Sequence, residues 1–390
     1  MKYNFDEIIP RIGTDCVKYD GAENLFGTTD ILPMWVADMD FSSPPCVTET
    51  LRRRVEHPIY GYTFTSPRWK PAIKRWVNHR YGWEIDEEEI GFVGGIVPAL
   101  SFAIQCFTKV GDKVLIQPPV YHPYHNVTRD LGRTVVTNPL KLVDGEYKID
   151  FNDFEEKAKE CSMFLLCSPH NPGGRVWNRT ELARMAEICV RNNVLVISDE
   201  IHCDMTLKGY KHIPFATVST EAEENSITLM AASKSFNIAG LKSSYHIIKN
   251  SNLRNRYCEF LSRSEQDFAP LFATETVAAA YEEGEEWLEQ MMEYVEENVN
   301  YVEEYIKENL PLLSMIRPQA SFLVFIDASK LELPQEKLVE FFINEAKVGM
   351  NDGSMFGEGG EGFMRMNVGC PRCILMKAMK QIKEAYDRAY

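Results

Sequence analysis

The sequence contains no apolar run that approaches the roughly 20 residues of a membrane-spanning helix. Runs such as 163–167 and 322–326 instead have the length of buried strands. The first seven residues also lack the apolar core of a signal peptide. We therefore expect a chain that stays in the cytosol and does not have a membrane as a partner.

Cysteine is too sparse for a disulfide-stabilised fold, because only 10 of the 390 residues are cysteine. Cys370 and Cys373 have the spacing of a metal-ligand pair, but no second pair and no nearby histidine complete a site. The favoured interpretation is two thiols that lie close by chance, so no metal is expected.

Basic residues are in deficit, with 42 lysines and arginines against 57 acidic residues and a formal net charge of −15. Such a charge repels nucleic-acid phosphates and anionic lipid head groups unless a local basic patch overrides it. The densest basic run, residues 52–54, is soon followed by Glu56. A nucleic-acid or membrane-surface role is therefore disfavoured.

What the sequence does contain is the composition of a globular protein, with 45% hydrophobic and 25% charged residues. From about residue 90, short apolar runs alternate with longer amphipathic ones, which predicts an α/β fold with a mostly parallel sheet between helices. Helices are expected at 98–107 and 180–192. Seven strands are expected, at 90–93, 113–117, 134–137, 163–167, 194–198, 226–229 and 244–248.

After residue 284 the pattern changes to that of a smaller α+β unit. A long acidic amphipathic helix is predicted at 285–309. We expect a large domain at 46–284 and a small domain made of 1–45 and 285–390. The small domain should continue with a strand, a helix, a Gly-rich loop, a strand and a closing helix, at 321–327, 334–346, 353–362, 363–368 and 371–389.

Lys234 lies in the most informative segment, residues 231–241, just after the predicted strand 226–229. Sheets of α/β proteins bind their ligands beyond the carboxyl ends of strands, so this lysine is a candidate Schiff-base amine. For the segment taken alone, an ordinary surface-loop lysine is the alternative.

Three further residues that could bind a ligand lie at or just after the ends of predicted strands. Asp199 closes the strand 194–198, and a carboxylate there must either reach solvent or find a cationic partner such as a pyridinium nitrogen. Asn171 lies in an Asn-Pro-Gly turn, where it could donate a hydrogen bond or simply form a good turn. Gly95 precedes a predicted helix whose first backbone amides could bind a phosphate.

Taken together, these residues resemble the cofactor site of a known enzyme family. From 11–14 to 371–372, nearly its whole length, the chain resembles the fold-type I pyridoxal 5′-phosphate (PLP) enzymes of the aspartate aminotransferase superfamily. At 34–41, 198–202 and 351–357 it resembles the MalY/PatB-like branch of cystathionine and cysteine-S-conjugate β-lyases. The resemblance implies a fold-type I large domain, PLP as cofactor and a homodimer.

Carried over residue by residue, the resemblance implies that the catalytic Lys234 holds the cofactor covalently and that Asp199 pairs with its pyridine nitrogen. Asn171 would donate to the phenolic oxygen, and Tyr121 would stack on the ring. Without this context, Tyr121 would be read as an ordinary core aromatic residue. The cofactor phosphate would be bound by Gly95, Ile96, Val97, Ser233 and Lys242.

Arg365 is implied to hold the α-carboxylate of the substrate. An arginine inside an apolar strand needs an anionic partner, and its planar fork can bind a carboxylate through two hydrogen bonds. Pairing with a buried acidic residue of the chain itself is the structural alternative. The resemblance also places Trp35 and Tyr121 against the substrate, and Tyr60 against the phosphate of a partner subunit.

Some positions depart from the aminotransferase pattern. Lys242 stands where most aminotransferases have arginine, which keeps the charge but loses the two-pronged geometry. His202, beside the cofactor, replaces a tyrosine of many aminotransferases and favours the lyase branch. His122 follows Tyr121 where some lyases have a second tyrosine, so the acid that protonates the leaving group stays open.

The resemblance implies a PLP-dependent carbon–sulfur β-lyase that cleaves cystathionine or other S-substituted cysteines to a thiol, pyruvate and ammonia. An aminotransferase is the main alternative, because it would share every cofactor contact. A cofactor-binding regulatory protein that no longer catalyses is a further alternative, against which the complete set of Lys234, Asp199 and Arg365 argues.

Overall fold

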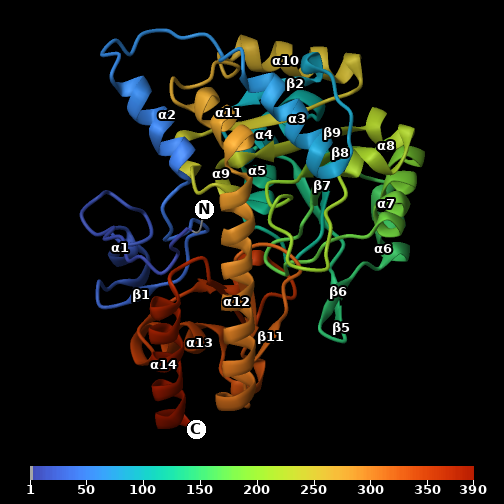
Figure 1. Ribbon diagram of the computed structural model, residues 1–390. Coiled ribbons are helices and arrows are strands. Elements are labelled where there is room, and N and C mark those ends of the chain that lie inside the picture. The colour runs from blue at the N-terminus through green and yellow to red at the C-terminus, as the bar shows by residue number, and fades with distance from the viewer. Residues whose placement is uncertain (1–2) are drawn as a thin grey trace.

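The large sheet dominates the computed structural model, which describes residues 3–390 (Figure 1). Its strand order is β2-β10-β9-β8-β7-β3-β4, and all neighbours are parallel except β10, which is antiparallel to both β2 and β9. The predicted mostly parallel sheet of seven strands is therefore confirmed. Its strands are β2 (Ile90–Val93), β3 (Lys113–Ile116), β4 (Thr134–Thr137), β7 (Met163–Cys167), β8 (Leu195–Asp199), β9 (Ser226–Ala231) and β10 (Ser244–Ile247).

Both faces of this sheet are covered, as the apolar strand sequences require. In β7, Met163 and Leu165 belong to one hydrophobic cluster and Phe164 and Leu166 to another, because successive side chains point to opposite faces. One cluster contains α4 (Ile96–Phe107), α5 (Pro123–Asp130) and α10 (Ser251–Arg263). The other contains α6 (Phe151–Ala158), α7 (Arg179–Arg191) and α8 (Thr220–Glu224).

The strand directions bring several loops to one edge of the sheet. Cys167 and Asp199, the last residues of β7 and β8, are register partners. Ser244, the first residue of β10, pairs with Val93 at the end of β2 and with Ala231 at the end of β9. The segments that follow β2, β7, β8 and β9 therefore meet where β10 begins.

The C-terminal part forms a second, smaller unit, as predicted. The long helix α12 (Glu285–Asn309) leads from the large sheet into it (Figure 1). Its sheet is antiparallel, in the order β11-β12-β15-β14. The elements are β11 (Ser314–Ile316), β12 (Leu323–Asp327), α13 (Gln335–Glu340), β14 (Asn351–Asp352), β15 (Phe363–Asn367) and α14 (Arg372–Ala389).

The N-terminal segment lies against this C-terminal unit. Strand β1 (Leu32–Pro33) pairs in parallel with β13 (Val348–Gly349), and the short helix α1 (Ala22–Phe26) lies nearby in Figure 1. This pairing accords with a small domain built from both ends of the chain. The exact division at residues 45 and 284 stays a prediction.

Some predicted boundaries were wrong for local reasons. The strand expected from residue 321 begins at Leu323, because Ser321 has φ +78°, a left-handed conformation outside the strand region. The helix expected over 334–346 is α-helical only in α13 and continues as a π-helix at Phe341–Glu345. Further elements were not predicted from the sequence, among them α2 (Pro45–Val55), α3 (Trp69–Tyr81), α11 (Ala273–Glu283) and the hairpin of β5 (Lys141–Val143) and β6 (Glu146–Lys148).

Candidate active site

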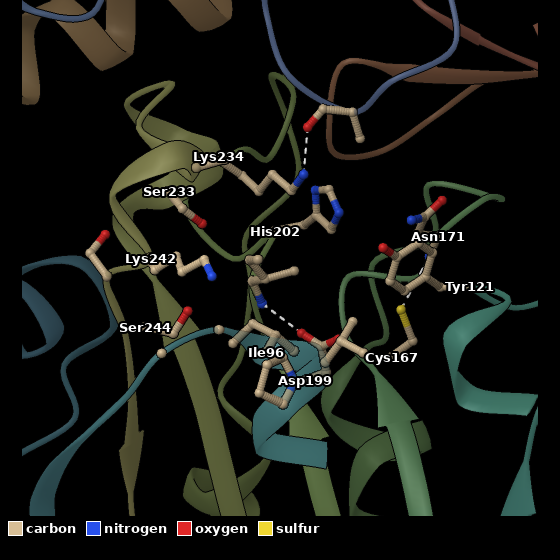
Figure 2. Close-up of a pocket in the computed structure, with 18 residues that line it drawn as sticks. Ile96, Tyr121, Cys167, Asn171, Asp199, His202, Ser233, Lys234, Lys242 and Ser244 are labelled. Carbon is tan, nitrogen blue, oxygen red and sulfur yellow. Dashed lines mark hydrogen bonds between the residues drawn. The ribbon is translucent and has the colours of Figure 1, made fainter. Parts of the chain in front are cut away.

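A cavity of about 250 Å³ lies at the edge of the large sheet where these strands end (Figure 2). Of the residues to which the resemblance assigns a role, Arg365, Trp35 and Tyr60 do not line it, and neither does His122, whose role was left open. The other residues with an assigned role all do: Gly95, Ile96, Val97, Tyr121, Asn171, Asp199, His202, Ser233, Lys234 and Lys242.

Lys234 lies in the single-turn helix α9 (Ala232–Ser235), directly after β9. Its Nζ donates a hydrogen bond to the carbonyl oxygen of Ala37. Burial lowers the pKa of Lys234 to about 8, and the positive charge of Arg365 adds to this effect. Asp38 and Asp199 act in the opposite direction. A lowered pKa leaves a larger fraction of the amine unprotonated near neutral pH, and only that form can act as nucleophile or base.

Asp199, the last residue of β8, is buried beneath the cavity. Tyr124 donates from its hydroxyl to Oδ2 at 2.8 Å, and the backbone N–H of Ile201 donates to Oδ1 at 3.1 Å. Burial raises the pKa of Asp199 to about 6. Within residues 3–390, no lysine, arginine or histidine forms an ion pair with this carboxylate. It therefore fits a cationic ring nitrogen in the cavity.

The amino terminus of α4 opens into the same cavity. The first N–H groups of a helix, here those of Ile96 and Val97, have no acceptor inside the helix and favour an anion. Gly95 precedes them with φ +152°, and a Cβ there would lie 3.3 Å from Cδ of Pro98. Figure 2 shows the side chain of Lys242 pointing into the cavity beside Ser233. These groups fit a phosphate.

Tyr121 and Asn171 line the opposite wall and are joined through their backbones. The N–H of Tyr121 donates to the carbonyl of Asn171 at 3.0 Å, and the N–H of Asn171 donates to Sγ of Cys167 at 3.3 Å. The side-chain oxygen of Asn171 accepts a hydrogen bond from Arg365. Its amide NH₂ is thereby left to donate to a group bound in the cavity.

His202 is buried, and its ring lies beside the amine of Lys234 (Figure 2). Burial lowers its pKa to about 3, with Lys234 and Arg365 contributing in the same direction. Its Nδ1 is buried and has no hydrogen-bond partner among the residues described. The ring is therefore neutral and can interact with a bound molecule without adding a positive charge.

Arg365 projects from β15 and is buried, with only 4% of its surface exposed. Its guanidinium donates to the side-chain oxygens of Asn171 at 3.1 Å and Asn351 at 2.6 Å, and to the carbonyl of Trp35 at 3.2 Å. It also lies 4.9 Å from the centre of the Phe356 ring. Its Nε has no hydrogen-bond partner in the part of the chain that is described.

No carboxylate within residues 3–390 forms an ion pair with Arg365, and burial lowers its pKa to about 10. The structure thus contradicts the alternative in which Arg365 pairs with a buried acidic residue. A buried arginine held only by neutral oxygens is suited to receive the carboxylate of a ligand.

Trp35 and Tyr60 lie apart from the cavity. The indole of Trp35 donates to the carbonyl of Lys18 at 3.0 Å, and the backbone carbonyl of Trp35 accepts a hydrogen bond from Arg365. Tyr60 is 58% exposed and donates from its hydroxyl to the carbonyl of Val55. Their proposed roles toward substrate and partner phosphate stay predictions.

Two groups of the site were missed in the sequence. Tyr124, the second residue of α5 and three residues after Tyr121, donates to Asp199, and its closeness in sequence to Tyr121 was the available signal. The carbonyl of Ala37 had no signal, because a backbone acceptor can be supplied by any residue type.

The described residues give no sign of a metal centre. Within 3–390, no group of three or more His, Cys, Asp or Glu side chains could hold a metal ion. All ten cysteines are free thiols, with Cys370 buried and Cys373 exposed. No helix in this part of the chain is long and apolar enough to cross a membrane.

Comparison with known proteins finds relatives over nearly the full length. Cystathionine beta-lyase PatB of Bacillus subtilis (strain 168) is 43% identical over 384 residues, covering 98% of this chain and 99% of that protein. Protein MalY of Escherichia coli (strain K12) is 34% identical, covering 97% of each. The PLP-bound C-S lyase from Staphylococcus hominis is structurally similar, with a TM-score of 0.92, 35% identity and coverage of 99% and 98%.

The profile of the family described as Aminotransferase class I and II matches residues 29–382. This match includes every residue that lines the cavity, and Arg365 beside it. The resemblance seen in the sequence is confirmed, and the chain belongs to the class I and II aminotransferase family.

Proposed function

We propose that this chain is a PLP-dependent carbon–sulfur β-lyase, which cleaves cystathionine or other S-substituted cysteines to a thiol, pyruvate and ammonia. The main support for this reaction type is the full-length similarity to a cystathionine beta-lyase and to a C-S lyase. The geometry supports the cofactor, because a buried carboxylate, an amine and a helix amino terminus converge on one cavity.

The residues of the chain would divide the work as follows. PLP, when bound, supplies an electron sink for the bonds at the substrate α-carbon. Asp199 would keep a proton on the ring nitrogen, and the amino terminus of α4 would bind the phosphate. Asn171 would donate its amide N–H to the ring oxygen, and Tyr121 would pack against the ring.

The substrate would be oriented between Arg365 and Lys234. Arg365 binds the α-carboxylate and so fixes the direction of the Cα–H bond. Nζ of Lys234 then takes the α-proton, and its lowered pKa keeps a useful fraction of the amine unprotonated near neutral pH. The thiolate leaves from Cβ.

An aminotransferase remains the second candidate, because the matched family bears that name. The two reactions share binding and α-proton removal and differ in whether the β-substituent leaves. One experiment separates them: the purified protein is incubated with cystathionine and, separately, with an amino acid plus a 2-oxo acid. Pyruvate together with homocysteine supports the lyase, whereas amino transfer without β-cleavage would overturn it.

The proposal includes a homodimer. Tyr60 is exposed and lies outside the cavity, so in this proposal it serves the phosphate bound by a partner subunit. A site of that kind would be complete only in the dimer.

A further inference from the structure

The segment of residues 35–41 has no regular secondary structure, yet its carbonyl groups are held one after another by side chains. Such an irregular backbone segment is kept in place by its side-chain partners, because it lacks a ladder of its own. Each carbonyl from residue 35 to residue 39 accepts a hydrogen bond: Trp35 from Arg365, Val36 and Asp38 from Asn367, Ala37 from Lys234, and Met39 from Asn237 and Arg11.

Two of these donors are residues of the proposed reaction. Arg365 has two other partners, the side chains of Asn171 and Asn351. The amine of Lys234 has the carbonyl of Ala37 as its one hydrogen-bond partner within the described chain. The position of segment 35–41 therefore matters more to Lys234 than to Arg365.

Arg11 holds this segment from outside the cavity. Its guanidinium makes two hydrogen bonds to the Asp38 carboxylate, at 2.7 and 3.0 Å, and one to Asp40 at 2.7 Å. The other oxygen of Asp40 accepts from Lys18, which is fully buried, at 2.6 Å. Two-pronged arginine–carboxylate pairs fix direction as well as distance.

The Arg11 side chain is 21% exposed and that of Asp38 is 22% exposed, so water can reach both. Removing Arg11 leaves Asp40 paired with Lys18, and leaves Asp38 partly hydrated. The fold should therefore survive replacement of Arg11, because no buried carboxylate loses its last partner.

We propose that Arg11 is a positioning residue for Lys234: through Asp38 and Asp40 it fixes segment 35–41, whose Ala37 carbonyl holds the free amine of Lys234. This inference rests on the proposed function, in which that amine must stand where it can take the α-proton. A displacement of about 1 Å at such a group can lower a rate on the order of 100-fold.

The test compares Arg11→Gln, Arg11→Lys and Asp38→Asn with wild type, all as PLP-loaded enzyme acting on cystathionine. Arg11→Gln should lower kcat about tenfold or more while KM changes about threefold or less, because Arg365 keeps its two other partners. Arg11→Lys should recover part of kcat, since it keeps the charge but not the fork. Arg191→Gln, on the exposed face of α7, is the matched control and should behave as wild type.

A second readout does not use turnover. PLP is removed from the full chain and then added back, and the rate of bond formation is followed by absorbance, as the Lys234 amine condenses with the PLP aldehyde and one water leaves. Arg11→Gln should slow this rate at least fivefold, and borohydride reduction with mass spectrometry should still place the adduct on Lys234.

Equal kcat per bound PLP in wild type and Arg11→Gln, with only a lower melting temperature, would overturn the proposal. If Arg11→Gln does not fold, Asp38→Asn decides, because it removes the charge and one prong of the Arg11–Asp38 pair and keeps the Arg11–Asp40 pair. Its kcat is measured as a function of pH, because the Asp38 charge also raises the pKa of Lys234. A loss of kcat that persists at the pH optimum supports the positioning role, and an unchanged maximal kcat overturns it. If wild type cleaves no S-substituted cysteine, the proposed function fails, and the rate of PLP uptake still tests the role of Arg11.

Discussion

Arg365 is the buried cation of the site, and the protein surrounds it with two amide oxygens and one carbonyl. Burying a charge without an opposite charge is costly, and burial does lower its pKa. A substrate carboxylate would supply the missing charge. The free-energy cost of burying this charge in the substrate-free chain would thus be offset by the binding energy gained when the substrate carboxylate pairs with it.

Arg365→Lys should lower kcat/KM for cystathionine by roughly 10- to 150-fold. The reason is the loss of a charged, two-pronged contact, worth about 1.5–3 kcal/mol. The cofactor absorption spectrum should hardly change. Steady-state kinetics and the spectrum of one preparation measure both quantities. A variant with unchanged turnover but a lower melting temperature and lower PLP content would point to a purely structural role.

Asp199 should make the stability of the PLP-free chain depend on pH. Its pKa is about 6 in the folded chain against an ordinary 3.8, so its contribution is fully present below about 3.8 and is lost as pH rises through 6. The loss should reach roughly 3 kcal/mol at neutral pH.

The comparison for this prediction is Asp199→Asn, which cannot ionise. Urea unfolding of the two PLP-free proteins between pH 4 and pH 7 should show the variant becoming the more stable one as pH rises. A difference that stays constant over this range would contradict the assignment. Added PLP should then stabilise wild type more than the variant, because only wild type can pair with a ring cation.

At the scale of elements, the site depends on strand ends and on one helix amino terminus. The amino end of α4 points its first N–H groups into the cavity, and Gly95 makes the entry to this helix possible. With φ +152°, Gly95 has a conformation that residues with a Cβ rarely adopt.

Gly95→Ala should raise the dissociation constant of PLP about tenfold or more. The strained alanine displaces the N–H groups of Ile96 and Val97, and a lost hydrogen bond to a charged group costs about 1.5–3 kcal/mol. Equilibrium titration with PLP measures the effect. Gly111→Ala is the matched control, because Gly111 also has a positive φ, +91°, and an added Cβ there would meet no atom within 4 Å. Equal PLP affinity in both variants would argue against a phosphate site at α4.

At the scale of the whole molecule, segment 59–64 is exposed and aromatic. Tyr62 and Phe64 are almost fully exposed, and Phe268 next to them is 73% exposed. They line a cavity of about 870 Å³ together with Tyr60. A contiguous apolar surface of this kind is unusual on a monomer and fits a subunit interface.

Tyr62→Glu should therefore shift the protein toward monomer and weaken PLP binding, because Tyr60 could no longer reach a partner site. Size-exclusion chromatography with light scattering gives the mass, and titration gives the PLP affinity. Val110→Glu, at an exposed apolar position in a turn that does not line this cavity, serves as control. A Tyr62→Glu protein that stays dimeric, or a fully active monomer, would contradict the prediction.

Local sequence patterns determined most of the large sheet and the roles expected of its strand ends. Apolar runs of strand length placed all seven strands to within two residues, because a strand buried on both faces needs continuous apolar side chains. Lys234 and Asp199 could be singled out because polar residues directly after such strands are conspicuous.

Only the tertiary structure decided what those residues face. That Arg365 has no acidic partner within residues 3–390 follows from which side chains surround β15, and these come from residues distant in sequence, such as Asn171. The hydrogen bonds from Lys234 to the Ala37 carbonyl and from Arg11 to Asp38 likewise join segments that are separate in sequence. A sequence pattern gives only the spacing of neighbouring residues, whereas contacts across the fold depend on how the elements pack. For this physical reason, only the tertiary structure could show which charges and hydrogen-bonding groups surround each residue of the site.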